Sequence, residues 1–341
     1  MSRSSVPTQE ATAKELDERC YLSAQAISSL KVSDHFQVLK FLGEGSYGKV
    51  MLAVHRKKGT AMALKFFPRQ STSLTSFLRE YNLSLSYCTH PSLTRALGIF
   101  FSTSSHYVFA QQAGLYGDLY SVIVSEAGLG EEQVQRVMSQ LSGAVTHLHT
   151  LGFVHRDIKP ENIFLCDSSC RWVKLGDFGL TRPIGYTVGA VWYESPFCTP
   201  EVEPVKEPEK HLWIRVEPCI DSWALGILTY CLLTGCFPWE ESTTDDPGYT
   251  KYKNHRNNPP PSQFRGLSSL VMALFRQLLN PDPELRGNPD EILSYLGGPW
   301  LMKTEQEERR RAEETEREAR KIREAGGGVE EEIVREGRGE R

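Results

Sequence analysis

The 341-residue sequence predicts an α+β fold in which a strand-rich part precedes a helix-rich part. From residue 36 to about residue 112, short apolar and β-branched runs are separated by Gly, Pro and Ser, as expected for strands and turns. After Gly114 the apolar residues recur three and four positions apart, which is the spacing of one helix face. Two unlike parts in this order predict two subdomains with a cleft between them, where ligands commonly bind.

The first part is expected to contain five strands and one helix. The strands are predicted at residues 36–41, 49–55, 61–67, 96–101 and 106–111. The helix is predicted near residues 76–86, between the third strand and the fourth.

The second part is expected to be mainly helical. A long amphipathic helix is predicted over residues 131–150, where apolar residues recur from Val134 to Leu148 and Gly152 supplies a stop signal. A second apolar run, at residues 223–237, is too short to span a bilayer, which needs about 20 residues. We predict that this run is a helix buried in the core.

The two ends of the chain lack a core-forming pattern. Residues 1–34 are polar and Ser-rich, which predicts an N-terminal extension that is partly helical around residues 14–30. Residues 302–341 are dense in charge, and pairs such as Glu305 with Arg309 favour a solvated helix. We expect a charged tail, helical or disordered; a coiled-coil segment is the weaker alternative because the apolar seam is missing.

Composition and charge limit the classes of partner. With 40% hydrophobic and 24% charged residues, the chain has the composition of an ordinary globular protein. A formal net charge of −4 gives no electrostatic reason to expect nucleic acid or an anionic membrane as a partner. The eight cysteines include no C-x-x-C pair, and the N-terminus has no apolar signal run, so we expect a cytoplasmic protein.

A glycine-rich run, Gly43-Glu-Gly45-Ser-Tyr-Gly48-Lys-Val50, has small residues that let backbone amides approach phosphate oxygens. A strand follows it, whereas a dinucleotide-binding fold needs a helix at this point. We therefore predict a hairpin that covers phosphates. The alternative is a glycine-rich β-turn without a ligand.

Lys65 stands in an apolar strand, 17 residues after Gly48. It can reach nucleotide phosphates beneath the hairpin if an acid fixes its side chain, and Glu80 in the following helix is the candidate acid. The alternatives are a surface lysine and a solvated glutamate, and Arg79 beside Glu80 leaves the helix register open.

The strongest motifs are His155-Arg-Asp157, with Asn162 five residues after the aspartate, and Asp177-Phe-Gly179. In order with the glycine-rich run and Lys65, they resemble the catalytic loop and the D-F-G motif of eukaryotic protein kinases. The resemblance covers residues 36–301. Three short segments, at residues 77–80, 107–111 and 200–202, are similar to the SH3-binding-domain kinase family of serine/threonine kinases.

This resemblance implies a bilobal protein-kinase-like fold. The N-lobe, residues 35–112, would be an antiparallel β-sheet with one helix, and the C-lobe, residues 113–301, would be mainly helical. Such proteins transfer the γ-phosphate of ATP, with Mg²⁺, to protein substrates.

The resemblance also implies a role for each motif residue. Asp157 would accept the proton of the substrate hydroxyl, and Asp177 and Asn162 would hold Mg²⁺. Lys65, clamped by Glu80, would hold the α- and β-phosphates, and Lys159 would contact the γ-phosphate and favour Ser/Thr substrates. The residues expected to contact ATP are Leu42, Gly43, Glu44, Gly45, Ser46, Tyr47, Gly48, Lys49, Val50, Ala63, Lys65, Glu80, Gln111, Asp118 and Phe164.

Supporting roles are implied for four further residues. Arg156 resembles the cation that docks a phosphate of the activation segment. Glu201 and Arg286 resemble a buried ion pair that closes this segment, and Asp221 resembles the acid that braces the catalytic loop.

The sequence departs from the family pattern at three places. Glu194 stands where a threonine is usual, so its carboxylate is expected to repel Asp157 unless it swings toward Lys159 or the substrate. Ser84 stands where a larger apolar residue is usual, which predicts a looser helix and a weaker closed state. Pro259-Pro-Pro261 is a short tract, so binding to SH3 domains is doubtful.

Three functions follow from these observations. The favoured one is an active serine/threonine kinase, because every charged group that phosphoryl transfer requires is present. The first alternative is a nucleotide-binding pseudokinase that acts as a scaffold or allosteric partner, prompted by Glu194 and Ser84. The second, a small-molecule kinase, is disfavoured by the protein-kinase form of the activation segment. The sequence identifies neither the substrate nor the oligomeric state.

Overall fold

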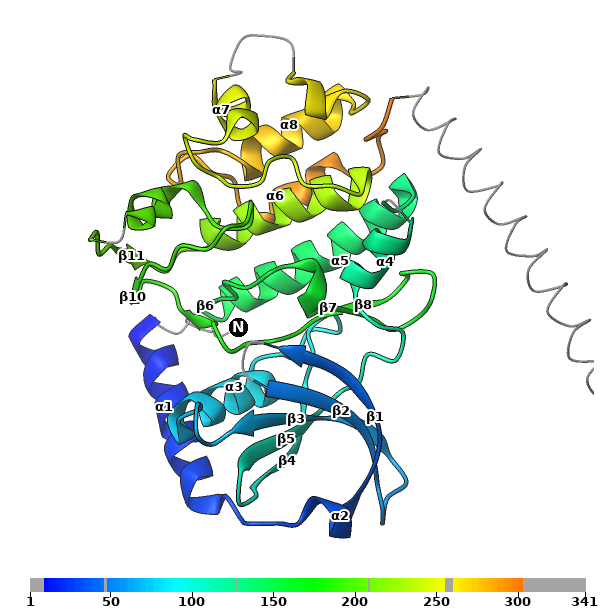
Figure 1. The fold of residues 1–341 in the computed structure, drawn as a ribbon, viewed down its shortest axis with the longest axis vertical. Helices are drawn as coiled ribbons and strands as arrows, with labels where there is room; N and C mark the ends of the chain where they lie inside the picture. The colour runs from blue at the N-terminus through cyan, green and yellow to red at the C-terminus, as the bar shows by residue number, and fades with distance from the viewer. Residues whose placement is uncertain (1–8, 46–47, 127, 208, 255–259, 303–341) are drawn as a thin grey trace, which may run out of the picture.

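The computed structural model describes residues 9–45, 48–126, 128–207, 209–254 and 260–302, and it has two lobes (Figure 1). A twisted sheet with helices forms the lower lobe in this view, and helices form most of the upper lobe. The predicted α+β class is therefore confirmed. Ser46, Tyr47, Pro259 and the tail after Met302 lie outside the described residues.

The N-lobe sheet contains five strands in the order β1-β2-β3-β5-β4, and each neighbouring pair is antiparallel. The strands are β1 (Phe36–Gly45), β2 (Gly48–His55), β3 (Ala61–Pro68), β4 (Ala96–Ser102) and β5 (His106–Gln111). All five predicted strands are present, and β1 extends beyond the predicted end to form a hairpin with β2. Gly48 lies at this hairpin, where a Cβ would overlap the carbonyl oxygen of Phe66.

Helix α3 (Leu74–Ser86) corresponds to the predicted helix of the first part. It begins at Ser73, whose hydroxyl accepts a hydrogen bond of 3.1 Å from the amide of Ser76. Phe77, on its inner face, packs against rings from β3 and β5 in an aromatic cluster beneath the sheet. This packing fixes which face of α3 points toward the centre of the molecule.

The N-terminal segment is more ordered than its weak sequence pattern indicated. Helix α1 (Gln9–Ala26) packs along α3, and α2 (Val32–His35) leads into β1 (Figure 1). Leu16 and Cys20 belong to the buried core. The apolar pattern of α1 is weak because its buried face also contains Thr12 and Ala13, which carry little hydrophobicity.

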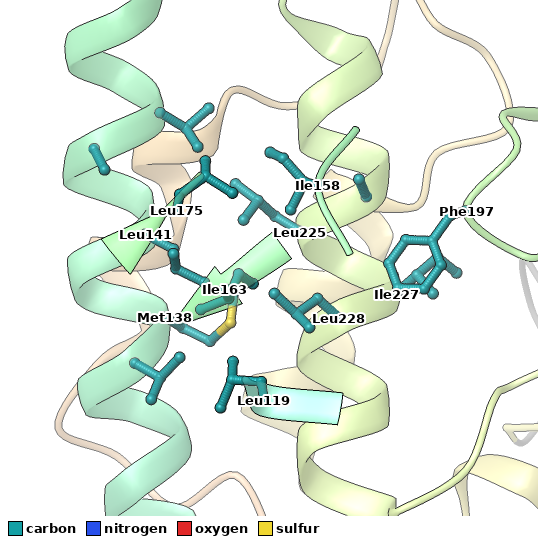
Figure 2. Packing of buried hydrophobic residues seen from close by; sticks show 14 of the residues in the cluster. Leu119, Met138, Leu141, Ile158, Ile163, Leu175, Phe197, Leu225, Ile227 and Leu228 are labelled. Atoms are coloured by element: carbon teal, nitrogen blue, oxygen red, sulfur yellow. The ribbon is translucent and has the colours of Figure 1, made fainter. Parts of the chain in front are cut away.

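The C-lobe is built around two long helices that face each other. Leu141 of α5 and Leu225 and Leu228 of α6 pack around Ile163 and neighbouring apolar side chains (Figure 2). The helices of this lobe are α4 (Leu119–Glu126), α5 (Glu131–Thr150), α6 (Cys219–Thr234), α7 (Pro247–Lys253) and α8 (Ser269–Leu278). The predicted helix over residues 131–150 is confirmed. The predicted buried core helix is α6, but it ends at Thr234 because Gly235 adopts a left-handed φ of 72°, and Phe237 beyond it is exposed.

Short strand pairs and 3-10 helices make up the remaining described secondary structure of the C-lobe. The strand pairs are β6 (Phe153–Val154) with β9 (Arg182–Pro183), β7 (Ile163–Leu165) with β8 (Val173–Leu175), and β10 (Thr187–Gly189) with β11 (Trp213–Arg215). The 3-10 helices are η1 (Pro160–Asn162), η2 (Pro200–Lys206), η3 (Ser262–Phe264) and η4 (Pro289–Tyr295). Among the described helices, none has both the length and the apolar character needed to cross a bilayer.

Candidate active site

A cleft of about 500 Å³ lies between the two lobes and collects most of the residues expected to contact a nucleotide. The predicted residues that line it are Leu42, Gly43, Glu44, Val50, Ala63, Lys65, Gln111, Asp118, Lys159, Asn162, Phe164 and Asp177. The lining also includes Gln112 and six residues that the sequence did not single out: Lys40, Phe41, Gly114, Leu115, Gly117 and Glu161. For Gly45, Gly48 and Lys49, in the same hairpin, contact with a nucleotide stays a prediction.

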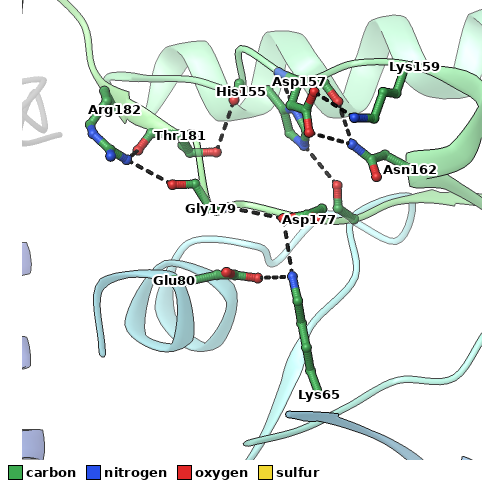
Figure 3. Close-up of polar contacts among 11 residues, drawn as sticks. Lys65, Glu80, His155, Asp157, Lys159, Asn162, Asp177, Gly179, Thr181 and Arg182 are labelled. Atoms are coloured by element: carbon green, nitrogen blue, oxygen red, sulfur yellow. Dashed lines mark hydrogen bonds and ion pairs between the residues drawn. The ribbon is translucent and has the colours of Figure 1, made fainter. Parts of the chain in front are cut away.

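Lys65 is the centre of a buried charge cluster (Figure 3). Its Nζ lies 2.6 Å from Glu80 Oε1 and 3.1 Å from Asp177 Oδ1. The antiparallel pairing of β3 with β2 and β5 holds the Lys65 backbone at the roof of the cleft. The predicted contact between Lys65 and Glu80 is confirmed, and the register left open by Arg79 is settled because α3 buries Glu80.

Burial and pairing shift the three ionisable groups of this cluster. Burial alone lowers the pKa of the Lys65 ammonium, but the two carboxylates outweigh it and hold the pKa above its ordinary value. Burial, together with the nearby charge of Asp177, raises the pKa of Glu80 to about 7. For Asp177, burial acts to raise the pKa, yet the Lys65 ammonium outweighs burial and the pKa lies below its ordinary value.

The backbone at Asp177 adopts a left-handed conformation with a φ of 59°, which is uncommon for a residue other than glycine. Its Oδ1 accepts a hydrogen bond of 3.3 Å from the amide of Gly179. The next residue, Phe178, is buried and packs edge-on against the ring of His155, with the centroids 5.3 Å apart. Packing of Phe178 thus holds the Asp177 carboxylate at the cleft.

Asp157 is held by two neighbours in the catalytic loop (Figure 3). Asn162 Nδ2 donates to Asp157 Oδ2 at 2.9 Å and to its carbonyl oxygen at 2.8 Å. Lys159 Nζ lies 3.2 Å from Asp157 Oδ1. Because both amide hydrogens of Asn162 are used toward Asp157, its Oδ1 is the atom left to coordinate a cation in the cleft.

Asp221, in α6, braces the backbone of this loop from the C-lobe side. The buried Asp221 carboxylate accepts hydrogen bonds from the amides of His155 and Arg156 at 2.9 and 2.8 Å. It also lies 2.7 Å from His149 Nε2. Burial acts to raise the pKa of Asp221, but these hydrogen bonds and the histidine outweigh burial and lower it. The predicted bracing role of Asp221 is confirmed by these contacts.

The activation segment is fixed to the C-lobe at two points. At its start, Arg156 Nη1 donates to the carbonyl oxygen of Leu180 at 3.0 Å. At its end, Arg286 makes two hydrogen bonds to the Glu201 carboxylate, at 3.1 and 2.9 Å, and this confirms the predicted ion pair. Docking of a phosphate by Arg156 stays a prediction.

A second hollow, of about 570 Å³, opens beside Asp157 and Lys159 on the outer side of the catalytic loop. Its walls are mainly apolar and include Val191 of the activation segment, Ala224 of α6, Phe237 beyond the end of α6, and Ile214 of β11. Sequence reasoning missed β11. The short run Trp213-Ile-Arg-Val216 carries the β-branched signal that would have marked it.

Pairing of β11 with β10 holds the middle of the activation segment. The amide of Ala190 donates to the carbonyl oxygen of Leu212 at 2.8 Å, and the amide of Val216 donates to that of Tyr186 at 2.7 Å. Glu194, farther along, is exposed. An exposed carboxylate is screened by water, so the expected repulsion of Asp157 is weak.

Ser84 is buried on α3, and its hydroxyl donates to the carbonyl oxygen of Thr94 at 2.9 Å. The small side chain at this position is therefore hydrogen-bonded to the segment before β4. This bond satisfies the hydroxyl but does not replace the apolar contact area of a larger residue.

Comparison with known proteins agrees with this geometry. Residues 36–300 match the family model described as "Protein kinase domain". The chain is 40% identical to the zebrafish (Danio rerio) serine/threonine-protein kinase SBK1, over 84% of this chain and 74% of that one. It is 39% identical to the rat (Rattus norvegicus) serine/threonine-protein kinase SBK2, over 92% and 86% of the two chains. With the human (Homo sapiens) SBK2 the identity is 38%, over 86% and 85%.

Proposed function

Because this chain belongs to the protein kinase family, and within it to the SH3-binding-domain group of serine/threonine kinases, we propose that it transfers the γ-phosphate of Mg-ATP to Ser/Thr hydroxyls of protein substrates. The observation that carries the proposal is the simultaneous pairing of Lys65 with Glu80 and with Asp177. Phosphoryl transfer needs the Lys–Glu pair and a metal-binding aspartate in place at the same time, and the two depend on different elements.

The cleft suits a nucleotide triphosphate. A buried ammonium at its roof attracts phosphate oxygens, and Asp118 lies at the opposite wall, where a carboxylate oxygen can accept from a ribose hydroxyl. Asp118 Oδ1 already accepts hydrogen bonds from the amide and hydroxyl of Ser121, which fix its orientation. These groups support the assignment of ATP as the phosphoryl donor.

The donor set at the floor of the cleft suits Mg²⁺. Asp177 and Asn162 both line the cleft and offer a carboxylate and an amide oxygen, the hard ligands that this ion prefers. When bound, Mg²⁺ supplies positive charge that neutralises the transferred phosphate. The lowered pKa of Asp177 keeps its carboxylate ionised at neutral pH, as a metal ligand requires.

Asp157 would act on the substrate hydroxyl. The hydroxyl oxygen forms a bond to the γ-phosphorus while its proton passes to a carboxylate oxygen of Asp157, and the bond to the bridging oxygen breaks with its electron pair leaving on ADP. Lys159, 3.2 Å from Asp157, adds positive charge next to the reacting oxygen. The apolar hollow beside both residues leaves room for the substrate chain.

The test is the intact mass of the protein after incubation with ATP and Mg²⁺, for the native chain, for Asp157→Asn and for Asp290→Asn, an exposed control. We expect added phosphate in the native chain and the control, and a rate about 10²- to 10⁴-fold lower in Asp157→Asn. Equal labelling of Asp157→Asn contradicts the assignment of the base.

Thermal stabilisation by ATP, measured in the same samples, separates the remaining alternative. If ATP stabilises the protein but neither the protein nor a supplied Ser/Thr peptide gains phosphate, the result favours a nucleotide-binding pseudokinase that acts as a scaffold. We expect stabilisation to persist in Asp157→Asn, because Lys65 and Asp177 are unchanged. The cytoplasmic location stays a prediction.

A further inference from the structure

Helix α1 occupies the outer side of α3, opposite the face that presents Glu80 to Lys65 (Figure 1). Its buried residues recur at the spacing of one helix face: Thr12, Ala13, Leu16 and Cys20, each less than 9% exposed. Leu22 on the same helix is 64% exposed. The helix therefore has one face that packs on the protein and one face in water.

Polar contacts join α1 to the middle of α3. Ser23 Oγ donates to Asn82 Oδ1 at 3.1 Å. Asn82 Nδ2 in turn donates to the carbonyl oxygen of Leu78 at 2.8 Å, which fixes the orientation of the amide. Asn82 is two residues after Glu80 and is buried, so it is held by α1 while Glu80 is held by Lys65.

The same helix also reaches the C-lobe. Thr12 packs over Gly152, where a Cβ would lie 3.5 Å from the threonine hydroxyl oxygen. Arg19 lies over the ring of Tyr87, just after α3, and Tyr87 packs against Phe153 of β6 with ring centroids 4.9 Å apart. A single helix thus contacts α3, Tyr87 just after it, and Gly152 of the C-lobe, the residue before β6.

The buried side of α3 carries a small side chain at one position, Ser84. Its hydroxyl donates one hydrogen bond, to the carbonyl oxygen of Thr94, and the side chain offers little apolar area for packing. Burying the charges of Lys65 and Glu80 costs desolvation free energy, which offsets much of their mutual attraction. This ion pair alone is therefore a weak support for the position of α3. A helix with a weak inner contact populates more than one position unless another surface favours one of them.

We propose that α1 is a built-in brace which holds α3 in the position where Glu80 pairs with Lys65, with Leu16 as its main positioning residue. The brace offsets the small side chain at Ser84. The chain itself supplies this contact surface on α3. This inference rests on the proposed function, because the position of α3 matters for phosphoryl transfer.

The test compares Leu16→Asp with Leu22→Asp, two identical substitutions on opposite faces of α1. A buried aspartate is expelled from an apolar contact, so Leu16→Asp should displace α1, whereas Leu22→Asp stays in water. We expect kcat to fall about tenfold in Leu16→Asp with the peptide KM little changed, and to stay within about twofold in Leu22→Asp. Leu16→Met, which keeps the apolar volume, should retain the native kcat.

Amide hydrogen exchange of residues 74–86, measured on the same full-length variants, reports the position of α3 without catalysis. We expect exchange in α3 to speed up in Leu16→Asp but not in Leu22→Asp. If Leu16→Asp shows no cooperative unfolding, Leu16→Ala replaces it with the same expected directions. A variant that lowers the thermal midpoint but keeps the native kcat and α3 exchange overturns the brace.

The two readouts separate the brace from the proposed function. If the native chain transfers no phosphate to itself or to a peptide, the proposed function fails, while the contrast in α3 exchange still decides whether α1 holds α3. If phosphate is transferred equally by all variants, the brace is wrong and the proposed function stands.

Discussion

The proposed nucleotide side and the proposed substrate side of the candidate active site are held by different forces. On the nucleotide side, the buried Lys65 ammonium lies 2.6 Å from the Glu80 carboxylate and 3.1 Å from the Asp177 carboxylate. On the substrate side, apolar side chains line an open hollow, and backbone hydrogen bonds between β10 and β11 fix the wall. The first arrangement demands specific residue types, whereas many sequences can form the second.

This difference explains why the two sides differ in tolerance to change. A buried charge that loses its partner is costly, because no water replaces the partner. In the β10–β11 pair, by contrast, a substitution costs only the backbone hydrogen bonds that it removes. Exposed residues near this pair, such as Glu194, are solvated by water. We therefore expect the effects of substitution to fall from the nucleotide side to the exposed part of the activation segment.

The largest effect is expected for Lys65→Met. It removes the cation that faces two buried carboxylates, and it removes the proposed phosphate contact. We expect transfer to fall at least about 100-fold, with weaker stabilisation by ATP. Lys57→Met, at an exposed turn, is the control and should behave as the native chain. Native activity in Lys65→Met would show that the nucleotide side does not depend on the charge of Lys65.

A smaller, selective effect is expected for Ala190→Pro. Proline has no amide hydrogen, so the 2.8 Å bond to Leu212 is lost and the wall of the hollow loosens. We expect kcat/KM for a peptide to fall about tenfold while the affinity for ATP is retained. Ala190→Ser keeps the amide and serves as the control. A loss of ATP affinity would show that the two sides are not independent.

A pH-dependent effect is expected from Glu80. Its pKa is raised from 4.5 to about 7 in the folded chain, so between these values the folded state binds a proton that the unfolded state has released. The free energy of unfolding therefore declines as pH rises through this window. Glu80→Gln does not titrate, and we expect its denaturant midpoint to lack this decline. Parallel profiles for both proteins would contradict the raised pKa.

The smallest effect is expected for Glu194→Thr, which restores the residue usual in related kinases. Because Glu194 is exposed, water and salt screen its charge from Asp157. We expect the peptide kcat to change by less than about threefold at physiological ionic strength. A large rise would mean that the native carboxylate restrains transfer, and the substrate side would then also depend on a charge.

Sequence patterns predicted the five N-lobe strands, α3, α5 and α6 because apolar periodicity is a local property that packing then preserves. They also identified Lys65, Asp157, Asn162 and Asp177, since phosphoryl transfer restricts these positions to particular chemical groups. The structure brings these four residues to one cleft or to its edge, as the motifs indicated.

The tertiary structure alone decided how distant segments support the site. It selected Glu80 over Arg79 as the inward residue of α3, placed α1 on the outer face of that helix, and paired β11 with the activation segment. These contacts join residues far apart in the chain, such as Ser23 and Asn82, which are separated by 59 positions. Small buried side chains and backbone hydrogen bonds make such contacts without a strong local signature, so only the folded chain reveals them.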